Sequence, residues 1–201
     1  MQISELRSVL NSVSIERFVE TQILGIVPWI FEDDHNAYAR WRNRIALEAG
    51  VEPNCLYVVG SAATGFSLSP QKAGRMFRTL SVSGADRSDI DVAVASEDLF
   101  LRAWNSILLI DRGSRPSGLQ GFRGKIRENV YWGHISEKAI PRNTSPSRQI
   151  RSMKTACTRE SPFLGYSVSL RVYRRDVDLR GYQVWSVRKL RSTLNAEDFA
   201  R

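Results

Sequence analysis

The sequence predicts an α/β (α+β) fold, in which a small mixed β-sheet is flanked by helices, and three observations lead to this prediction. A short apolar run at residues 56–59 (LYVV) ends at Gly60, which is typical of a buried strand that stops at a turn. A second run, 89–96, alternates so that one face is apolar, the pattern of a strand with a buried side. Helical spacing of apolar residues before and after these runs predicts the helices that cover the sheet.

The segment that precedes the first strand is predicted to be helical. Proline lacks an N–H and restricts the residue before it, so Pro28 separates two helices. Asp33 or Asp34 can cap the second helix, and Gly50 is its expected end. The helices predicted here span 3–24, with a break near 12–14, and about 34–49.

Beyond the second strand, Ser96 is a good N-cap, and acidic residues follow it where a helix dipole favours them. The polar, basic segment 141–154 is predicted to be exposed, either as a nucleic-acid contact or as a linker. The elements predicted here are a helix over 97–110, a loop over 112–124, a helix over 125–139, a strand over 166–175 and a final helix.

Length and composition predict one domain over residues 1–201. Its parts are a helical segment (1–52), a core (53–110) and a basic segment (111–201). No apolar run is long enough to span a bilayer, so we expect no membrane contact. The only two cysteines do not make a disulfide framework, which favours a reducing cytoplasm. The two cysteines are Cys55 and Cys157. Together with His35 and His134 they do not have the spacing of a recognised zinc site.

The net charge of +8 is unevenly distributed. Residues 111–191 contain 18 Lys and Arg against 6 Asp and Glu, whereas the rest of the chain is acidic overall. Such asymmetry is typical of a protein with a polyanionic partner, here RNA or DNA through the basic half, or a nucleotide. The alternatives are a basic surface that only aids solubility or one that docks an acidic protein partner.

The candidate site lies where the two central strands meet. Asp89 and Asp91 are two residues apart, so they share one face of their strand. Paired carboxylates repel unless a cation lies between them, and Mg²⁺ binds such carboxylates together with phosphates. The alternative for this pair is a solvated strand edge. Gly60 lets the backbone approach a phosphate, and Ser61 offers a hydroxyl. The other candidates for binding a triphosphate are Thr64, which continues the turn, and Lys72, Arg75 and Arg78, which could equally lie in a solvated loop.

The strand followed by Gly60–Ser61, with Asp89-x-Asp91 on the next strand, resembles the signature of the DNA polymerase β-like nucleotidyltransferase superfamily. The resemblance covers residues 56–96, and the segment 66–88 is longer than the corresponding gap in small members. It implies that the Gly-Ser turn holds a nucleoside triphosphate and that the Asp pair binds two Mg²⁺ or Mn²⁺ ions. The implied activity is transfer of a nucleoside monophosphate to a hydroxyl of RNA, protein or nucleotide. It also implies a place in a bacterial toxin–antitoxin or antiviral defence module.

A third metal-binding acid, which the superfamily takes from a later strand, has no obvious counterpart. Asp176 directly follows the predicted strand 166–175 and could complete the catalytic set. Alternatively, either Asp176 or Asp178 could cap the last helix. The polar face of that strand offers Ser169 and Arg171 where a carboxylate is wanted. The alternative function is therefore a catalytically degenerate subunit that binds nucleic acid or a partner protein. Asp86 is a lesser candidate for the metal cluster.

Overall fold

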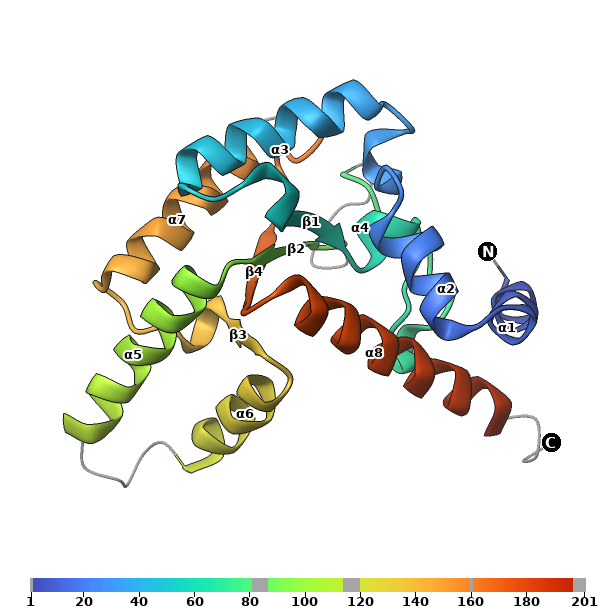
Figure 1. Cartoon of the computed structure of the whole chain (residues 1–201). Coiled ribbons are helices and arrows are strands. Elements are labelled where there is room, and N and C mark those ends of the chain that lie inside the picture. Colours follow the sequence, from blue (N-terminus) through green and yellow to red (C-terminus); the bar gives the residue numbers. More distant parts are fainter. Residues whose placement is uncertain (1, 81–86, 114–119, 160, 197–201) are drawn as a thin grey trace.

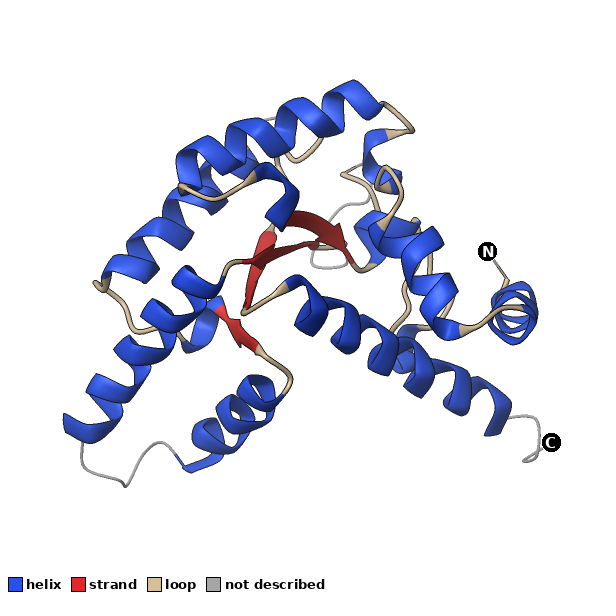
Figure 2. Cartoon of the chain, viewed as in Figure 1, coloured by secondary structure: helices blue, strands red, loops and turns tan. Residues whose placement is uncertain are grey.

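The computed structural model of the protein (Figure 1) describes residues 2–80, 87–113, 120–159 and 161–196. At its centre is a four-stranded sheet with the strand order β1-β2-β4-β3. Helices surround this sheet (Figure 2), so the predicted α+β architecture is confirmed. The strands are β1 (Leu56–Val59), β2 (Ile90–Ala95), β3 (His134–Ser136) and β4 (Val168–Tyr173).

The sheet is mixed. Strand β1 runs antiparallel to β2, β2 runs parallel to β4, and β3 pairs antiparallel with β4 at the edge. In this register Asp91 lies between Val59 on β1 and Ser169 on β4. The strand predicted over 166–175 therefore lies beside the strand that bears Asp91.

One face of the sheet is covered by α3 (His35–Ala49), α5 (Glu97–Gly113) and α7 (Ser145–Thr158), which form an arc in Figure 1. Alternate residues of each strand point to these helices, because strand side chains alternate between faces. Burial of these aliphatic side chains is the main stabilising contribution of this layer. The sheet residues in this core are Leu56, Val58, Ile90, Val92, Val94, Val168, Leu170 and Val172.

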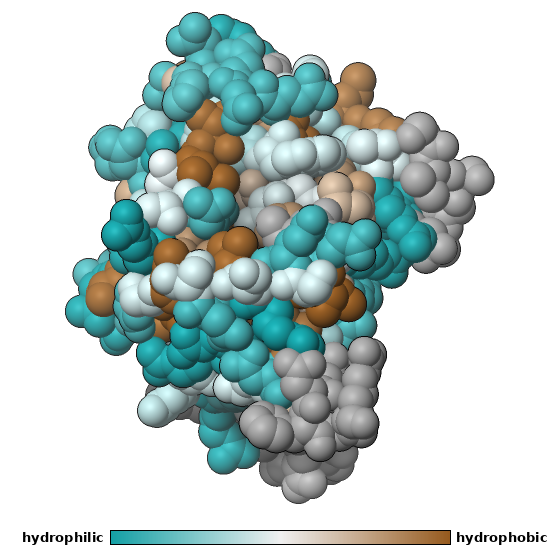
Figure 3. Space-filling model, turned by 90° about the vertical axis from the view of Figure 1, so that its right-hand side faces the viewer, coloured by the Kyte–Doolittle hydropathy of each residue, from teal (hydrophilic) through white to brown (hydrophobic). Residues whose placement is uncertain are grey.

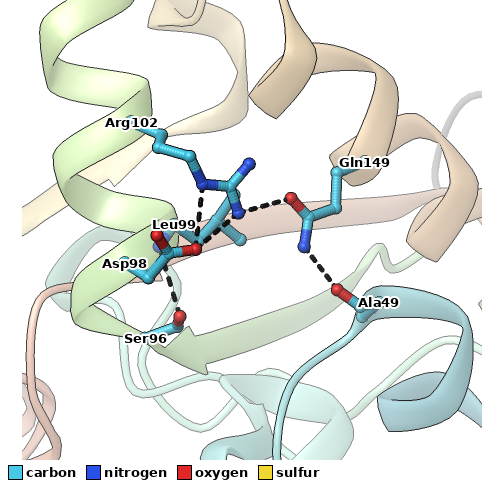
Figure 4. A network of polar contacts seen from close by, with 6 residues as sticks. All are labelled: Ala49, Ser96, Asp98, Leu99, Arg102 and Gln149. Atoms are coloured by element: carbon cyan, nitrogen blue, oxygen red, sulfur yellow. Dashed lines mark hydrogen bonds and ion pairs between the residues drawn. The ribbon is translucent and has the colours of Figure 1, made fainter.

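The helices of this layer are joined by polar contacts as well (Figure 4). Arg102 on α5 binds Asp98 one turn earlier at 2.7 Å and also donates to Gln149 on α7 at 2.8 Å. Gln149 in turn donates to the carbonyl of Ala49, the last residue of α3. The Ser96 hydroxyl accepts from the N–H of Leu99 at 3.3 Å, as an N-cap does. These contacts connect all three helices at the end of β2.

The other face packs against α1 (Ile3–Ser12), α2 (Ile15–Val19), the π-helical turn η1 (Glu20–Leu24) and α8 (Asp176–Ala196). Figure 3 views this side, where hydrophilic side chains cover most of the surface and hydrophobic atoms appear in strips between them. The sheet contributes Tyr57, Val59, Ala93 and Tyr173 to this second core. The polar residues of β2 and β4 belong to the same face and lie next to it.

Short helical turns connect these elements. They are η2 (Trp29–Phe31), η3 (Pro53–Cys55), α4 (Ser61–Thr64), η4 (Pro70–Lys72) and η6 (Glu137–Ala139). Within the described part of the chain, no helix combines the length and the apolar character needed to cross a bilayer.

Capping signals in the sequence mark the observed helix ends. The break predicted near 12–14 is the junction between α1 and α2, where the Ser14 hydroxyl accepts from the N–H of Arg17. Asp34 caps α3 by accepting from the N–H of Ala37 at 2.9 Å. Gly50 ends α3 with a φ of 62°, a left-handed conformation that glycine adopts without strain.

The prediction of one helix over 125–139 is wrong in its second half. Helix α6 spans Gln120–Tyr131, and Gly133, with a φ of 69°, then turns the chain into β3. His134 and Ile135 pair with Tyr173 and Val172 on β4, and both are buried. This strand exists because β4 offers an edge for pairing, which local spacing does not reveal. The predicted loop at 112–124 is helical at both ends, and 114–119 lie outside the described residues.

The prediction for 141–154 holds only in part: most of its residues are exposed or half-buried, but the segment is not a linker. Most of this segment lies in α7, which Thr144 caps by accepting from the N–H of Ser147 at 3.3 Å. Ile150 and Met153 are buried against the sheet layer. Two apolar residues three apart on one helix face are enough to dock a helix whose other positions are polar.

Candidate functional site

A cleft of about 520 Å³ lies between the turn after β1, the polar residues of β2 and β4, and helix α8. This volume is in the range of small-molecule sites. The structure brings together here the sequence-predicted residues Gly60, Ser61, Lys72, Arg75, Asp89 and Asp91. Thr64 and Asp176, which were also predicted, do not line the cleft.

The Gly60 turn lies directly against the carboxylate of Asp91. Gly60 has φ 67° and ψ −152°, a backbone conformation that is essentially restricted to glycine. A Cβ at this position would be 2.8 Å from Oδ2 of Asp91, closer than van der Waals contact allows. Glycine is therefore required at position 60 for two reasons: the backbone conformation and the lack of space for a side chain beside Asp91.

Ser61 and Thr64 have different roles in this turn. Ser61 is half-buried and lines the cleft as the first residue of α4. The Thr64 hydroxyl donates to the carbonyl of Phe66 at 2.6 Å, which stabilises the turn from behind. Thr64 is therefore placed to hold the loop, and Ser61 is placed to contact a ligand.

The two aspartates lie on the cleft side of β2. Asp89 is exposed just before the strand begins, and Asp91 is half-buried within it. Oδ1 of Asp91 accepts a hydrogen bond from the hydroxyl of Ser169, its neighbour on β4. Carboxylates suit a hard divalent cation. Among the residues that the structure describes, no group of three or more Asp, Glu, His or Cys converges to hold a metal.

Arg171 projects into the cleft from β4, two residues after Ser169. It donates to the hydroxyl of Tyr182 at 3.2 Å, and its guanidinium lies 5.6 Å from the centre of that ring. Burial alone would lower the pKa of Arg171, but Tyr182, Tyr173 and Asp91 outweigh it and raise the pKa above its usual value. Arg171 is therefore a fixed positive charge beside Asp91.

The lining of the cleft is electropositive overall. Among the residues that the structure describes, five cationic side chains and two aspartates line it, and the cations come from the 67–76 loop, the segment just before β2, β4 and α8. Such an excess of positive charge in a concave site attracts anions. The cations are Lys72, Arg75, Arg87, Arg171 and Lys189. Arg78 does not line the cleft; its N–H donates instead to the hydroxyl of Ser88 at 3.0 Å.

The two acids considered as a third metal ligand are engaged elsewhere. Asp176 begins α8, accepts from the Tyr57 hydroxyl at 2.7 Å and pairs with Arg180. Asp178 pairs with Arg174 and Arg175, each at 3.2 Å. Burial would raise the pKa of Asp178, but these two arginines lower it. Both acids lie in the first turn of α8, where the helix dipole favours them, and Asp86 lies outside the described residues.

Six residues of α8 line the cleft and none was predicted as a site residue; they include Tyr182, Gln183 and Trp185. Gln183 offers the only available signal, since it occupies a buried position in register with Leu179 and Val187. A polar residue at such a position needs a partner, and sequence alone does not say what the partner is.

A second, smaller groove of about 300 Å³ lies between α3 and α7. Among the described residues of its lining, the cations are Arg44, Arg148, Arg151 and Arg159, and Glu48 is the one acid. Lys154, on the same helix, is outside it and pairs with Glu137 at 2.7 Å. The basic segment predicted as a nucleic-acid contact thus forms part of a concave basic surface.

In comparisons with protein families, with curated proteins and with solved structures, none matched the chain. The resemblance to nucleotidyltransferases therefore depends on Gly60–Ser61, on the Asp89–Asp91 pair and on the cleft that they share.

Proposed function

We propose that the cleft binds a nucleoside triphosphate with a divalent cation and transfers its nucleoside monophosphate to an acceptor hydroxyl. The observation that carries the proposal is the convergence of Gly60–Ser61, the Asp89–Asp91 pair and five cations in one cleft. Phosphoryl-transfer sites combine three features: a turn whose backbone comes close to the phosphates, carboxylates that hold the metal ion, and surrounding cations. They come here from segments far apart in the sequence.

The residues present fit one Mg²⁺ ion. Mg²⁺ is commonly held by one or two carboxylates together with substrate phosphates, and Asp89 and Asp91 supply two. Bound at these carboxylates, the ion would neutralise phosphate charge and favour departure of pyrophosphate. The hydrogen bond from Ser169 orients Asp91 for this role. The structure supports a single ion better than two, since no third acid among the described residues joins the pair.

The cationic side chains of the cleft would bind the phosphates and stabilise the charge that develops during transfer. Lys72 and Arg75 would bind the phosphates from the loop that follows the turn, with Ser61 contacting the same group. Arg171 would stabilise the negative charge that develops during transfer, because it is fixed beside Asp91 and stays protonated. In this arrangement the arginine occupies the strand where the superfamily places an acid.

The same arginine favours a second candidate function, nucleotide binding without transfer. Ser169 and Arg171 stand where a third carboxylate was expected, and Asp176 is bound to Tyr57 and Arg180 instead. A subunit of this kind would retain the cleft for recognition. Its partner would be a nucleic acid or a protein, and the arginine-lined groove between α3 and α7 supports nucleic acid.

One experiment separates these functions. The protein is incubated with each α-labelled nucleoside triphosphate, Mg²⁺ or Mn²⁺, and total RNA or protein as acceptor, and nucleotide binding is measured in parallel by calorimetry. Transfer that disappears in D89N and D91N supports the enzyme, with D98N, an exposed acid paired to Arg102, as the control. Binding without transfer supports the second candidate. Absence of both contradicts the cleft as a nucleotide site.

A further inference from the structure

The α8 wall of the cleft carries an aromatic ring and a carboxamide that phosphate and metal binding would not use. Trp185 and Gln183 line the cleft together with the residues proposed to hold the triphosphate. A nucleoside triphosphate has a second half, the base and sugar, which needs its own contacts.

Trp185 is held as a fixed platform. Its ring centre lies 5.0 Å from that of Trp132 on the segment before β3 and 5.7 Å from that of Tyr182. The ammonium of Lys189 lies 5.5 Å from the same ring. Trp185 is only half-buried, so part of it remains accessible from the cleft. A rigid aromatic ring beside a cationic cleft is the arrangement on which nucleobases stack.

Gln183 supplies a polar group without a protein partner. It is 9% exposed and lies on the buried side of α8 between Leu179 and Val187. Within the described ranges its carboxamide has no hydrogen-bond partner, and it is not among the fully buried unpaired polar groups, so it is accessible from the cleft that Gln183 lines. The N–H groups of the carboxamide can therefore donate to a ligand in the cleft, and its carbonyl oxygen can accept from the same ligand.

The carboxamide distinguishes between the purines. Adenine presents a donor at N6 beside an acceptor at N7, which a glutamine pairs with in bidentate fashion. Guanine presents two acceptors on the same edge, O6 and N7, so one carboxamide cannot satisfy both. We infer that Trp185 and Gln183 form an adenine subsite in the cleft, an inference that rests on the proposed binding of a nucleoside triphosphate there.

The test compares ligands that share the triphosphate and differ in the base. Binding of inorganic tripolyphosphate and of the α,β-methylene analogues of ATP and GTP is measured by calorimetry with Mg²⁺; the methylene bridge prevents transfer. The variants are W185L, W185F and Q183L, and Y131L is the control for loss of an aromatic ring outside the cleft. Leucine at 183 has apolar neighbours on α8, so this variant keeps the buried side of the helix apolar.

In the wild type we expect the ATP analogue to bind more tightly than the GTP analogue and than tripolyphosphate. W185L should weaken ATP-analogue binding roughly tenfold or more, while tripolyphosphate binding is unchanged. The affinity of W185F for the ATP analogue should lie between those of the wild type and W185L, because a smaller ring remains. Q183L should abolish the preference for the ATP analogue over the GTP analogue.

Two results would overturn the inference, and they differ in what they say of the proposed function. If tripolyphosphate and the ATP analogue bind equally well, and W185L affects neither, the base subsite is wrong while the triphosphate site stands. If neither ligand binds to the wild type, the triphosphate site and the subsite are both wrong.

Discussion

Oδ1 of Asp91 accepts a hydrogen bond from the hydroxyl of Ser169, which joins adjacent residues on the parallel strands β2 and β4. The other carboxylate oxygen, Oδ2, faces the Gly60 turn, where an added Cβ would be 2.8 Å away. Asp91 is therefore held from two sides, by a strand and by a turn that lie far apart in the sequence. Its orientation depends on both neighbours.

Removing the Ser169 hydroxyl should weaken metal binding without removing a ligand. We expect S169A to bind Mn²⁺ roughly ten- to a hundredfold more weakly, the usual effect of losing a group that orients a metal ligand. S169T keeps the hydroxyl and a strand-compatible side chain, so its affinity should stay near that of the wild type. Calorimetric titration with Mn²⁺ decides this, and equal affinities for S169A and S169T would contradict it.

Substitution of Gly60 should harm both the fold and the site. G60A forces alanine into a backbone conformation that costs of order 1–3 kcal/mol and places its Cβ against Asp91. G181A is the matched control, because Gly181 is exposed on α8 with open space around it. That variant should be about 0.5–1 kcal/mol more stable, since alanine favours helices. Urea denaturation measures both, and a neutral G60A would contradict the strained turn.

The buried imidazole of His134 should make stability fall in mild acid. Burial, with a smaller contribution from the charge of Arg171, lowers the pKa of His134 from 6.5 to about 4. The groups that face it are Arg171, Tyr173 and Tyr182, and none of these is an acid that could stabilise the charged ring. Below pH 6.5 the unfolded chain binds a proton that the folded chain does not, so the free energy of unfolding decreases until about pH 4.

This contribution amounts to about 2 kcal/mol between pH 7 and pH 5. H134F places a ring of similar shape between the two tyrosines and should remove that part of the pH dependence. H35Q, which replaces an exposed histidine, should keep it. Urea denaturation at the two pH values gives the comparison, and parallel curves for H134F and the wild type would be the contrary result.

The groove between α3 and α7 should contribute to nucleic-acid binding through phosphates. R151E reverses a charge in the groove, so we expect weaker RNA binding and a salt dependence shallower by about one unit of slope. R17E makes the same change of net charge at an exposed position of α2, across the sheet from the groove. Fluorescence anisotropy at several salt concentrations measures both. Equal losses in R151E and R17E would show that only net charge matters.

Local signals in the sequence were sufficient for the central elements. The apolar run ending at Gly60, the alternation through Asp91 and the caps at Asp34 and Ser96 each reflect interactions within a few residues. Such interactions act before any tertiary contact forms, so the strands and most helices could be predicted. The neighbouring positions of Gly60, Ser61, Asp89 and Asp91 in the cleft follow from these strands.

Tertiary structure decided the rest, because the remaining contacts join residues that are distant in the chain. Strand β3 forms only where β4 provides an edge, and Asp176 pairs with Tyr57 across 119 residues. Gln183 and Trp185 enter the cleft because α8 packs against the sheet face that carries Asp91. By itself the sequence determined which strands bear the aspartates and the glycine turn. Long-range packing determined that an arginine, rather than a third acid, stands beside them.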